Sequence, residues 1–142
     1  MIRQLLVMCG LLGAAACLAG CGDDANLEDY SAPLRVVERT EFYLTGLKDK
    51  RLPSPDFDGN NSLALSFSGE LIRLTLPAAV DSGIKDASRK QQAADKCEQL
   101  KKLFDEQVDA PARESPPQID KAVAGVEQCL AIVAEVKDML GG

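Results

Sequence analysis

The segment "SLALSFSGELIRLTL", residues 62–76, shows the clearest alternation of apolar and polar side chains in the chain. Three apolar residues alternate before Ser68-Gly69, and three more alternate in the opposite phase after it: Leu63, Leu65, Phe67, Ile72, Leu74 and Leu76. A period of two indicates β-strands, and a two-residue turn at Ser68-Gly69 accounts for the change of phase. The segment therefore predicts a β-hairpin. Because an isolated hairpin is marginally stable in water, its apolar face must pack against helices.

Residues 34–47, "LRVVERTEFYLTGL", precede the hairpin and group their apolar side chains on one helical face. That face consists of Val36, Val37, Thr40, Tyr43, Leu44 and Leu47. Spacings of three and four residues are typical of an amphipathic helix. A β-strand is the alternative, because β-branched and aromatic residues are frequent here. We expect a helix in this part of the chain.

Two longer amphipathic helices are predicted after the hairpin, over residues 83–108 and from about Pro116 to Leu140. Cys97 and Cys129 lie on the apolar faces of the first and the second of these helices. The segment "DAPARES", residues 109–115, separates them, and a short connection makes two long helices antiparallel neighbours. Residues 34–142 therefore predict a single small α+β domain: an N-terminal helix, a β-hairpin and a long antiparallel helical hairpin.

The N-terminus has the features of an export signal. Arg3 supplies a positive charge, and residues 5–20, "LLVMCGLLGAAACLAG", form an uncharged apolar run. This run is shorter than the ~20 residues that a helix needs to span a bilayer. A charged start, an apolar run and small residues before a break are typical of a secretory signal. We therefore expect residues 1–20 to be a signal peptide that is removed from the mature protein.

Leu18-Ala19-Gly20-Cys21 resembles the lipobox of bacterial lipoproteins. The resemblance implies cleavage between Gly20 and Cys21, attachment of diacylglycerol to the Cys21 sulfur, and acylation of its new amino group by a fatty acid such as palmitate. Each buried methylene contributes ~0.8 kcal/mol, so two or three chains on one cysteine hold a protein firmly on a membrane. Residues 21–33 then form a short acidic tether.

The residue after the lipidated cysteine bears on the location. In this lipoprotein class, Asp at that place favours retention in the inner membrane, whereas this chain has Gly22. The resemblance therefore implies the inner leaflet of the outer membrane, facing the periplasm, in preference to the inner membrane.

The five cysteines separate into groups once the signal peptide is removed. Cys9 and Cys17 leave with it and Cys21 carries lipid, which leaves Cys97 and Cys129 as a pair in an oxidising compartment. The two are also equally far from Arg113, on opposite sides of the predicted turn. The oxidising compartment, the even number of remaining cysteines and their equal distances from the turn together predict a Cys97–Cys129 disulfide. Two buried free thiols, packed as small hydrophobic side chains, are the alternative.

The residue inventory restricts the chemistry. The chain has no His, which excludes Ser-His-Asp and Cys-His nucleophile systems, and it has no phosphate-binding glycine motif. No catalytic, metal-binding or cofactor-binding residue is assigned. Carboxylate pairs such as Asp105/Glu106 or Asp56/Asp58 could serve a glycosidase-like reaction, but pairs of this kind are expected by chance in a chain with 22 acidic residues. We therefore expect a protein that is not an enzyme.

The net charge of −6 argues against nucleic acid as a partner. The expected function is that of a membrane-anchored periplasmic lipoprotein, which binds or scaffolds an envelope partner or serves it as an accessory, an inhibitor or an immunity protein. Two alternatives remain open. One is a carboxylate-dependent hydrolase of the envelope or cell wall, and the other is a carrier of a small apolar ligand.

Overall fold

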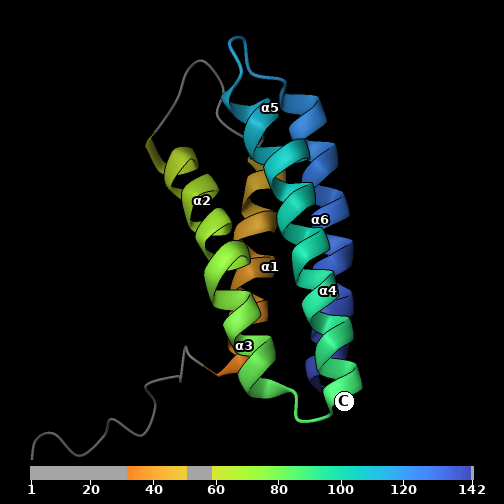
Figure 1. Cartoon of the computed structure of the whole chain (residues 1–142). Coiled ribbons are helices and arrows are strands. Elements are labelled where there is room, and N and C mark those ends of the chain that lie inside the picture. The colour runs from red at the N-terminus through yellow and green to blue at the C-terminus, as the bar shows by residue number, and fades with distance from the viewer. Residues whose placement is uncertain (1–31, 51–58, 142) are drawn as a thin grey trace, which may run out of the picture.

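The computed structural model describes residues 32–50 and 59–141, which form four long helices running alternately up and down the molecule (Figure 1). The first and the last are α1 (Pro33–Asp49) and α6 (Ile119–Gly141). The second, the α2–α3 helix, is continuous through α2 (Gly59–Glu70), the π-helical η2 (Leu71–Thr75) and α3 (Leu76–Gly83). The third, the α4–α5 helix, is continuous through α4 (Ala87–Phe104), the π-helical η3 (Asp105–Asp109) and α5 (Ala110–Arg113).

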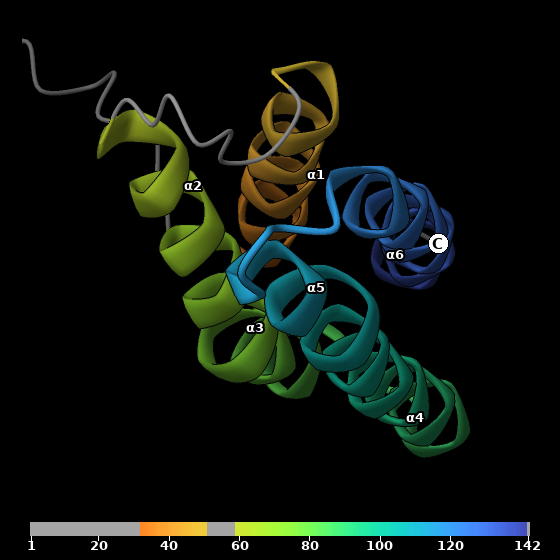
Figure 2. The same ribbon diagram turned by 90° about the horizontal axis from the view of Figure 1, so that it is seen from above.

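The four helices close into a ring around one core (Figure 2). α1 lies between the α2–α3 helix and α6, and α4 packs against both α3 and α6. Ion pairs cross these seams: Lys137 on α6 contacts Glu41 on α1 at 2.8 Å, Lys90 on α4 contacts Asp81 on α3 at 3.2 Å, and Lys96 on α4 contacts Glu135 on α6. The fold of the described residues is therefore an antiparallel four-helix bundle, and the expected α+β class was wrong.

The predicted β-hairpin over residues 62–76 was wrong, because this segment lies within the α2–α3 helix. Its buried residues recur at helical spacing when Ser68 and Gly69 are counted among them: Leu65, Ser68, Gly69, Leu71, Ile72 and Leu76. The expected turn residues sit instead where α2 packs against the α4–α5 helix. A Cβ on Gly69 would lie 2.6 Å from the Arg73 guanidinium and 3.3 Å from the Phe104 ring. Gly69 is small because the helices approach closely, and its φ is not positive.

Each π-helical segment ends two residues before a proline, at Pro77 and at Pro111. A proline inside a helix cannot donate to the carbonyl four residues earlier, and its ring clashes with that carbonyl. A wider π-turn just before the proline accommodates the clash without ending the helix. This explains why both helices continue past residues 76 and 108, where the sequence predicted the end of a strand and of a helix.

The prediction of a helix over residues 34–47 is confirmed by α1. Its core-facing residues are Val36, Val37, Thr40, Leu44 and Leu47, and the apolar ones belong to the same core cluster as Leu100 and Phe104 of α4 and Val126 and Val133 of α6. The buried Thr40 hydroxyl donates to the Val36 carbonyl at 2.9 Å, so it needs no partner outside its own helix. The antiparallel pairing of the last two helices is also confirmed.

The predicted Cys97–Cys129 disulfide was wrong: both residues are free thiols buried in the core. The register between α4 and α6 explains the error. Lys96 contacts Glu135 at 2.5 Å, and the Gln107 carbonyl lies against Gly125, so Cys97 is level with about residue 134 of α6. An offset of about five residues separates the two cysteines by roughly 7 Å along the helix axis. This exceeds what a disulfide can bridge once the distance between the helices is added.

One helical stretch in the described part of the chain, Leu63–Gly83, is long and apolar enough to cross a membrane by length and composition. In the bundle, 44% of its apolar window is buried against the other helices. A core helix of a soluble protein meets the same criterion, so this stretch is weak evidence for a span.

Candidate binding groove

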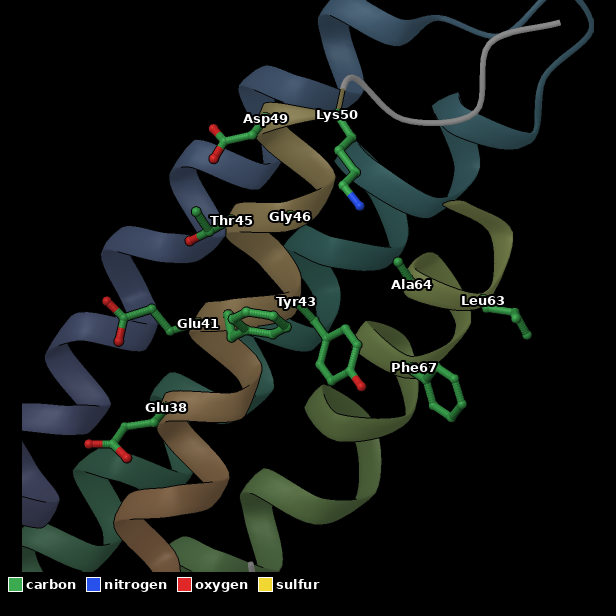
Figure 3. A pocket seen from close by; sticks show the side chains of 11 residues that line it. Glu38, Glu41, Tyr43, Thr45, Gly46, Asp49, Lys50, Leu63, Ala64 and Phe67 are labelled. Carbon is green, nitrogen blue, oxygen red and sulfur yellow. The ribbon is translucent and has the colours of Figure 1, made fainter. Parts of the chain in front are cut away.

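An open groove of about 710 Å³ lies between the second half of α1 and the first turns of α2 (Figure 3). Its lining is Glu38, Glu41, Phe42, Tyr43, Thr45, Gly46, Asp49 and Lys50 from α1, and Leu63, Ala64 and Phe67 from α2. The lining residues of α1 extend from its second turn, at Glu38, to its C-terminal end. We call this site the α1–α2 groove.

Three aromatic side chains form a row across the groove. The Tyr43 ring extends from α1 toward α2, with its centroid 5.9 Å from that of Phe67 and 5.6 Å from that of Phe42 (Figure 3). Phe42 is 73% exposed, Phe67 47% and the neighbouring Leu63 56%. A row of large apolar side chains left in solvent loses the free energy of burial, and such patches mark interaction sites on soluble domains.

The helical period explains why these side chains are exposed. On α1, the core takes Thr40, Leu44 and Leu47, which leaves Phe42 on the outer face between them. On α2, Leu65 and Ser68 are buried, so Leu63 and Phe67 turn outward. Sequence reasoning had placed Leu63 and Phe67 on the buried face of a hairpin. The exposed position of Phe42, on the polar side of a helix that was predicted correctly, was the one signal of the groove available in the sequence.

The α1 side of the groove is acidic. Glu38, Glu41 and Asp49 line it, and Lys50 is the single basic residue in the lining. Glu38 contacts Arg35 at 2.9 Å, and Glu41 accepts a hydrogen bond from Lys137 at 2.8 Å, which raises the Lys137 pKa. Both carboxylates remain partly open, at 36% and 47% exposure of the side chain. Within the described residues Asp49 has no ion-pair partner.

The other candidate residues lie elsewhere. Asp105 is bound by Arg73 on the outside of the bundle, and Glu106 beside it is exposed. Burial raises the pKa of the Cys97 thiol to about 11, with a smaller contribution from Glu98, and burial raises that of Cys129 to about 12. Neither thiol is therefore ionised or accessible at neutral pH, as a nucleophile must be.

Several predicted positions fall outside the described residues: Gly20 and Cys21, at the expected cleavage and lipidation site, and Asp56 and Asp58. Among the side chains that the structure describes, no three His, Cys, Asp or Glu residues are grouped so that they could hold a metal ion. The α1–α2 groove is therefore the site in the described bundle with a defined shape, an apolar floor and a charged wall.

The chain matches no family model, no curated protein and no solved structure. Its function has to be proposed from the groove and from the N-terminal residues themselves.

Proposed function

We propose that the protein is a membrane-anchored lipoprotein of the bacterial envelope that binds a protein partner through the α1–α2 groove. The observation that carries this proposal is the aromatic row in which the half-buried Tyr43 lies between the exposed Phe42 and Phe67. Aromatic side chains are enriched at the centres of protein interfaces, where they contribute much of the binding energy. A binding, scaffolding or accessory role needs such a surface and no catalytic group.

The anchor is proposed from the resemblance of Leu18-Ala19-Gly20-Cys21 to a lipobox, with Cys21 as the first residue of the mature protein and the outer membrane as its location. The tether of residues 21–33 joins the bundle at the start of α1. The centre of the aromatic row, at Tyr43, lies about 15 Å further along α1, given a rise of 1.5 Å per residue. This position favours a partner in the periplasm over contact with the lipid surface.

The carrier of a small apolar ligand is less well supported. Sites for small molecules bury most of the ligand surface in a concave pocket. The α1–α2 groove is open instead. About half or more of the side-chain surface of Phe42, Leu63 and Phe67 remains exposed to solvent. The hydrolase is less well supported too, because Asp105 is held by Arg73 on a convex surface and the carboxylates of the groove all lie on one wall.

The test is affinity capture from detergent-solubilised envelope with the lipid-free domain, residues 22–142. We expect an envelope protein to be retained by the wild-type domain and lost with the double variant Phe42→Ser/Phe67→Ser. Both side chains are substantially exposed, so stability should change by less than about 0.5 kcal/mol per site. Circular dichroism and thermal unfolding confirm that the variant is folded.

Leu74→Ser is the matched control, because Leu74 is 67% exposed on the same helix and does not line the groove. It should retain the captured protein at the wild-type level. Retention of the same protein by the Phe42→Ser/Phe67→Ser domain would contradict the proposal, and so would the absence of any envelope protein above background.

A further inference from the structure

We infer that the α1–α2 groove receives a basic amphipathic α-helix of its partner, with the apolar face of that helix on the aromatic row and its Lys and Arg side chains against the acidic wall of α1. This inference rests on the proposed function and specifies the chemistry of the partner.

The shape of the groove is suited to binding an α-helix. It lies between two packed helices, and Leu63 and Phe67 on α2 are four residues apart, on one face. Residues at this spacing form ridges, and the ridges of a third helix fit into the grooves beside them. The row from Phe42 through Tyr43 to Phe67 gives such a helix an apolar floor.

The backbone of the groove excludes partners that add a β-strand. Its lining residues belong to α1 and α2, whose N–H and C=O groups are used within the helices apart from the terminal turns. A bound strand would find no free sheet edge and would leave its own backbone groups unpaired. A helix satisfies its own backbone and needs only side-chain packing, so the groove selects a helix.

The acidic residues of α1 determine the sign of the charge that a partner segment must carry. Glu38, Glu41 and Asp49 extend from the side of α1 that faces away from α2, opposite Tyr43 (Figure 3), and Asp49 lacks an ion-pair partner in the described bundle. Glu38 and Glu41 are partly exposed and can accept a second cation. The whole chain carries −6, which adds a long-range attraction for a basic segment. Complementary charge of this kind raises the rate of association and selects among partners.

The same wall argues against two other occupants. An anionic bilayer surface would face three carboxylates, and like charges repel. A second copy of the chain would bring its own Glu38, Glu41 and Asp49 to the shared interface, with one Lys50 to offset them. A basic helix from a different protein removes this repulsion and is therefore the occupant that the groove favours.

The experiment uses two synthetic peptides of about 18 residues, or five helical turns, with Leu at positions i, i+3, i+4 and i+7. One carries Lys at the flanking positions and the other carries Glu. Each is titrated into the ¹⁵N-labelled lipid-free domain. We expect the Leu/Lys peptide to shift the amide signals of Tyr43, Gly46 and Ala64, with binding at least about tenfold tighter than that of the Leu/Glu peptide and weakened by added salt.

Variants with reversed charges distinguish binding at the groove from general attraction of a basic peptide to an acidic protein. Glu38→Lys/Asp49→Lys should reverse the preference between the peptides, while Glu41 is left in place because it pairs with Lys137. The matched control, Glu106→Lys/Glu127→Lys, changes the net charge equally at exposed positions outside the groove. It should keep the preference for the Leu/Lys peptide.

Three results would overturn the inference. The first is equal binding of both peptides, or shifts spread over the whole bundle. The second is a change of the groove signals on dilution, which indicates a second copy as the occupant. The third is the same shifts with anionic phosphatidylglycerol vesicles. If envelope capture depends on Phe42 and Phe67 but not on Glu38 and Asp49, the proposed function stands and the basic helix is wrong.

Discussion

Arg73 on η2 donates hydrogen bonds from Nε and Nη2 to Oδ1 of Asp105 on η3, at 3.0 and 2.5 Å, so that one ion pair joins the two π-helical segments of the bundle. The same guanidinium lies 3.8 Å from Asp109 and 5.7 Å from the centroid of the buried Phe104 ring. Both segments have wider turns that accommodate a following proline. Arg73 therefore connects the two places where the second and third helices depart from regular α-helical geometry.

Replacement of Arg73 by Met should lower the free energy of unfolding by about 1 kcal/mol, through loss of the ion pair and of the cation–π contact with Phe104. Met keeps an unbranched apolar side chain beside the Phe104 ring. The decrease in the free energy of unfolding therefore comes mainly from removal of the charge. Urea unfolding of the lipid-free domain measures it. The control is Arg113→Met, which removes the pair that a more exposed arginine makes with Asp109 within one helix, and it should change stability by less than about 0.5 kcal/mol. Equal effects of the two variants would contradict the role given to Arg73.

Gly125→Ala should destabilise the bundle by about 1–3 kcal/mol, the usual cost of overpacking a core. A Cβ at this position would lie 2.5 Å from the Gln107 carbonyl oxygen, which is backbone and cannot rotate away. Pro111 cannot donate to that same carbonyl, which turns toward α6 in the widened η3 segment. Thermal unfolding compares this variant with wild type.

Gly46→Ala is the matched control for Gly125→Ala. Gly46 also lies within a helix, but a Cβ there would meet nothing within 4 Å. Ala exceeds Gly in helix propensity by about 0.5–1 kcal/mol, so this variant should be stabilised by roughly that amount. If both variants are stabilised, α6 does not approach η3 as closely as described.

The sequence predicted the helices whose apolar periodicity was carried by large residues. α1 and α6 are of this kind: Thr40, Leu44 and Leu47 follow at steps of four and three residues on α1, and Val126 and Val133 are seven residues apart on α6. The prediction failed where small residues carried the helical period. Ser68 and Gly69 belong to the core of the α2–α3 helix, but serine and glycine in an alternating segment are also typical of a turn. The turn propensity of Ser68 and Gly69 favoured a hairpin, but the packing of the α2–α3 helix against the α4–α5 helix favours the helix.

The position of the cysteines could not be deduced from equal distances to Arg113. That reasoning assumed regular helices and a turn centred on Arg113, whereas α5 continues to Arg113 and α6 begins only at Ile119. The turn is therefore centred later in the chain, which shifts the register.

The groove could not be deduced either, because it depends on how α2 packs beside α1. Phe42 was visible as an apolar residue on a polar face, without a second residue to suggest a site.

The lipid anchor is tested by metabolic labelling. Cells expressing the full chain and supplied with labelled palmitate should incorporate label into the wild type. Cys21→Ala should abolish the label and leave an unprocessed precursor, because the sulfur of Cys21 is the attachment point that the lipobox implies. Cys97→Ala is the control and should be labelled like the wild type, since Cys97 is buried in the bundle. Label on the Cys21→Ala protein would place the anchor elsewhere.

The two buried thiols should make the bundle less stable in alkaline solution. Burial raises the pKa from 9.0 to about 11 for Cys97 and to about 12 for Cys129. Above pH 9 the unfolded chain loses these protons while the folded bundle keeps them, so the free energy of unfolding falls as pH rises from 9 toward 12. Below pH 9 both states are protonated, and the thiols contribute no dependence on pH.

Urea unfolding at pH 8 and pH 10.5 under reducing conditions measures this effect in the wild type and in Cys97→Ala/Cys129→Ala. The double variant should be less stable at pH 8, because two buried sulfur atoms are lost from the core. It should nevertheless lose less stability than the wild type between the two pH values, since the remaining Lys and Tyr groups are common to both proteins. Equal losses in the two proteins would mean that the thiols ionise alike in the folded and unfolded chains, and that they are not buried.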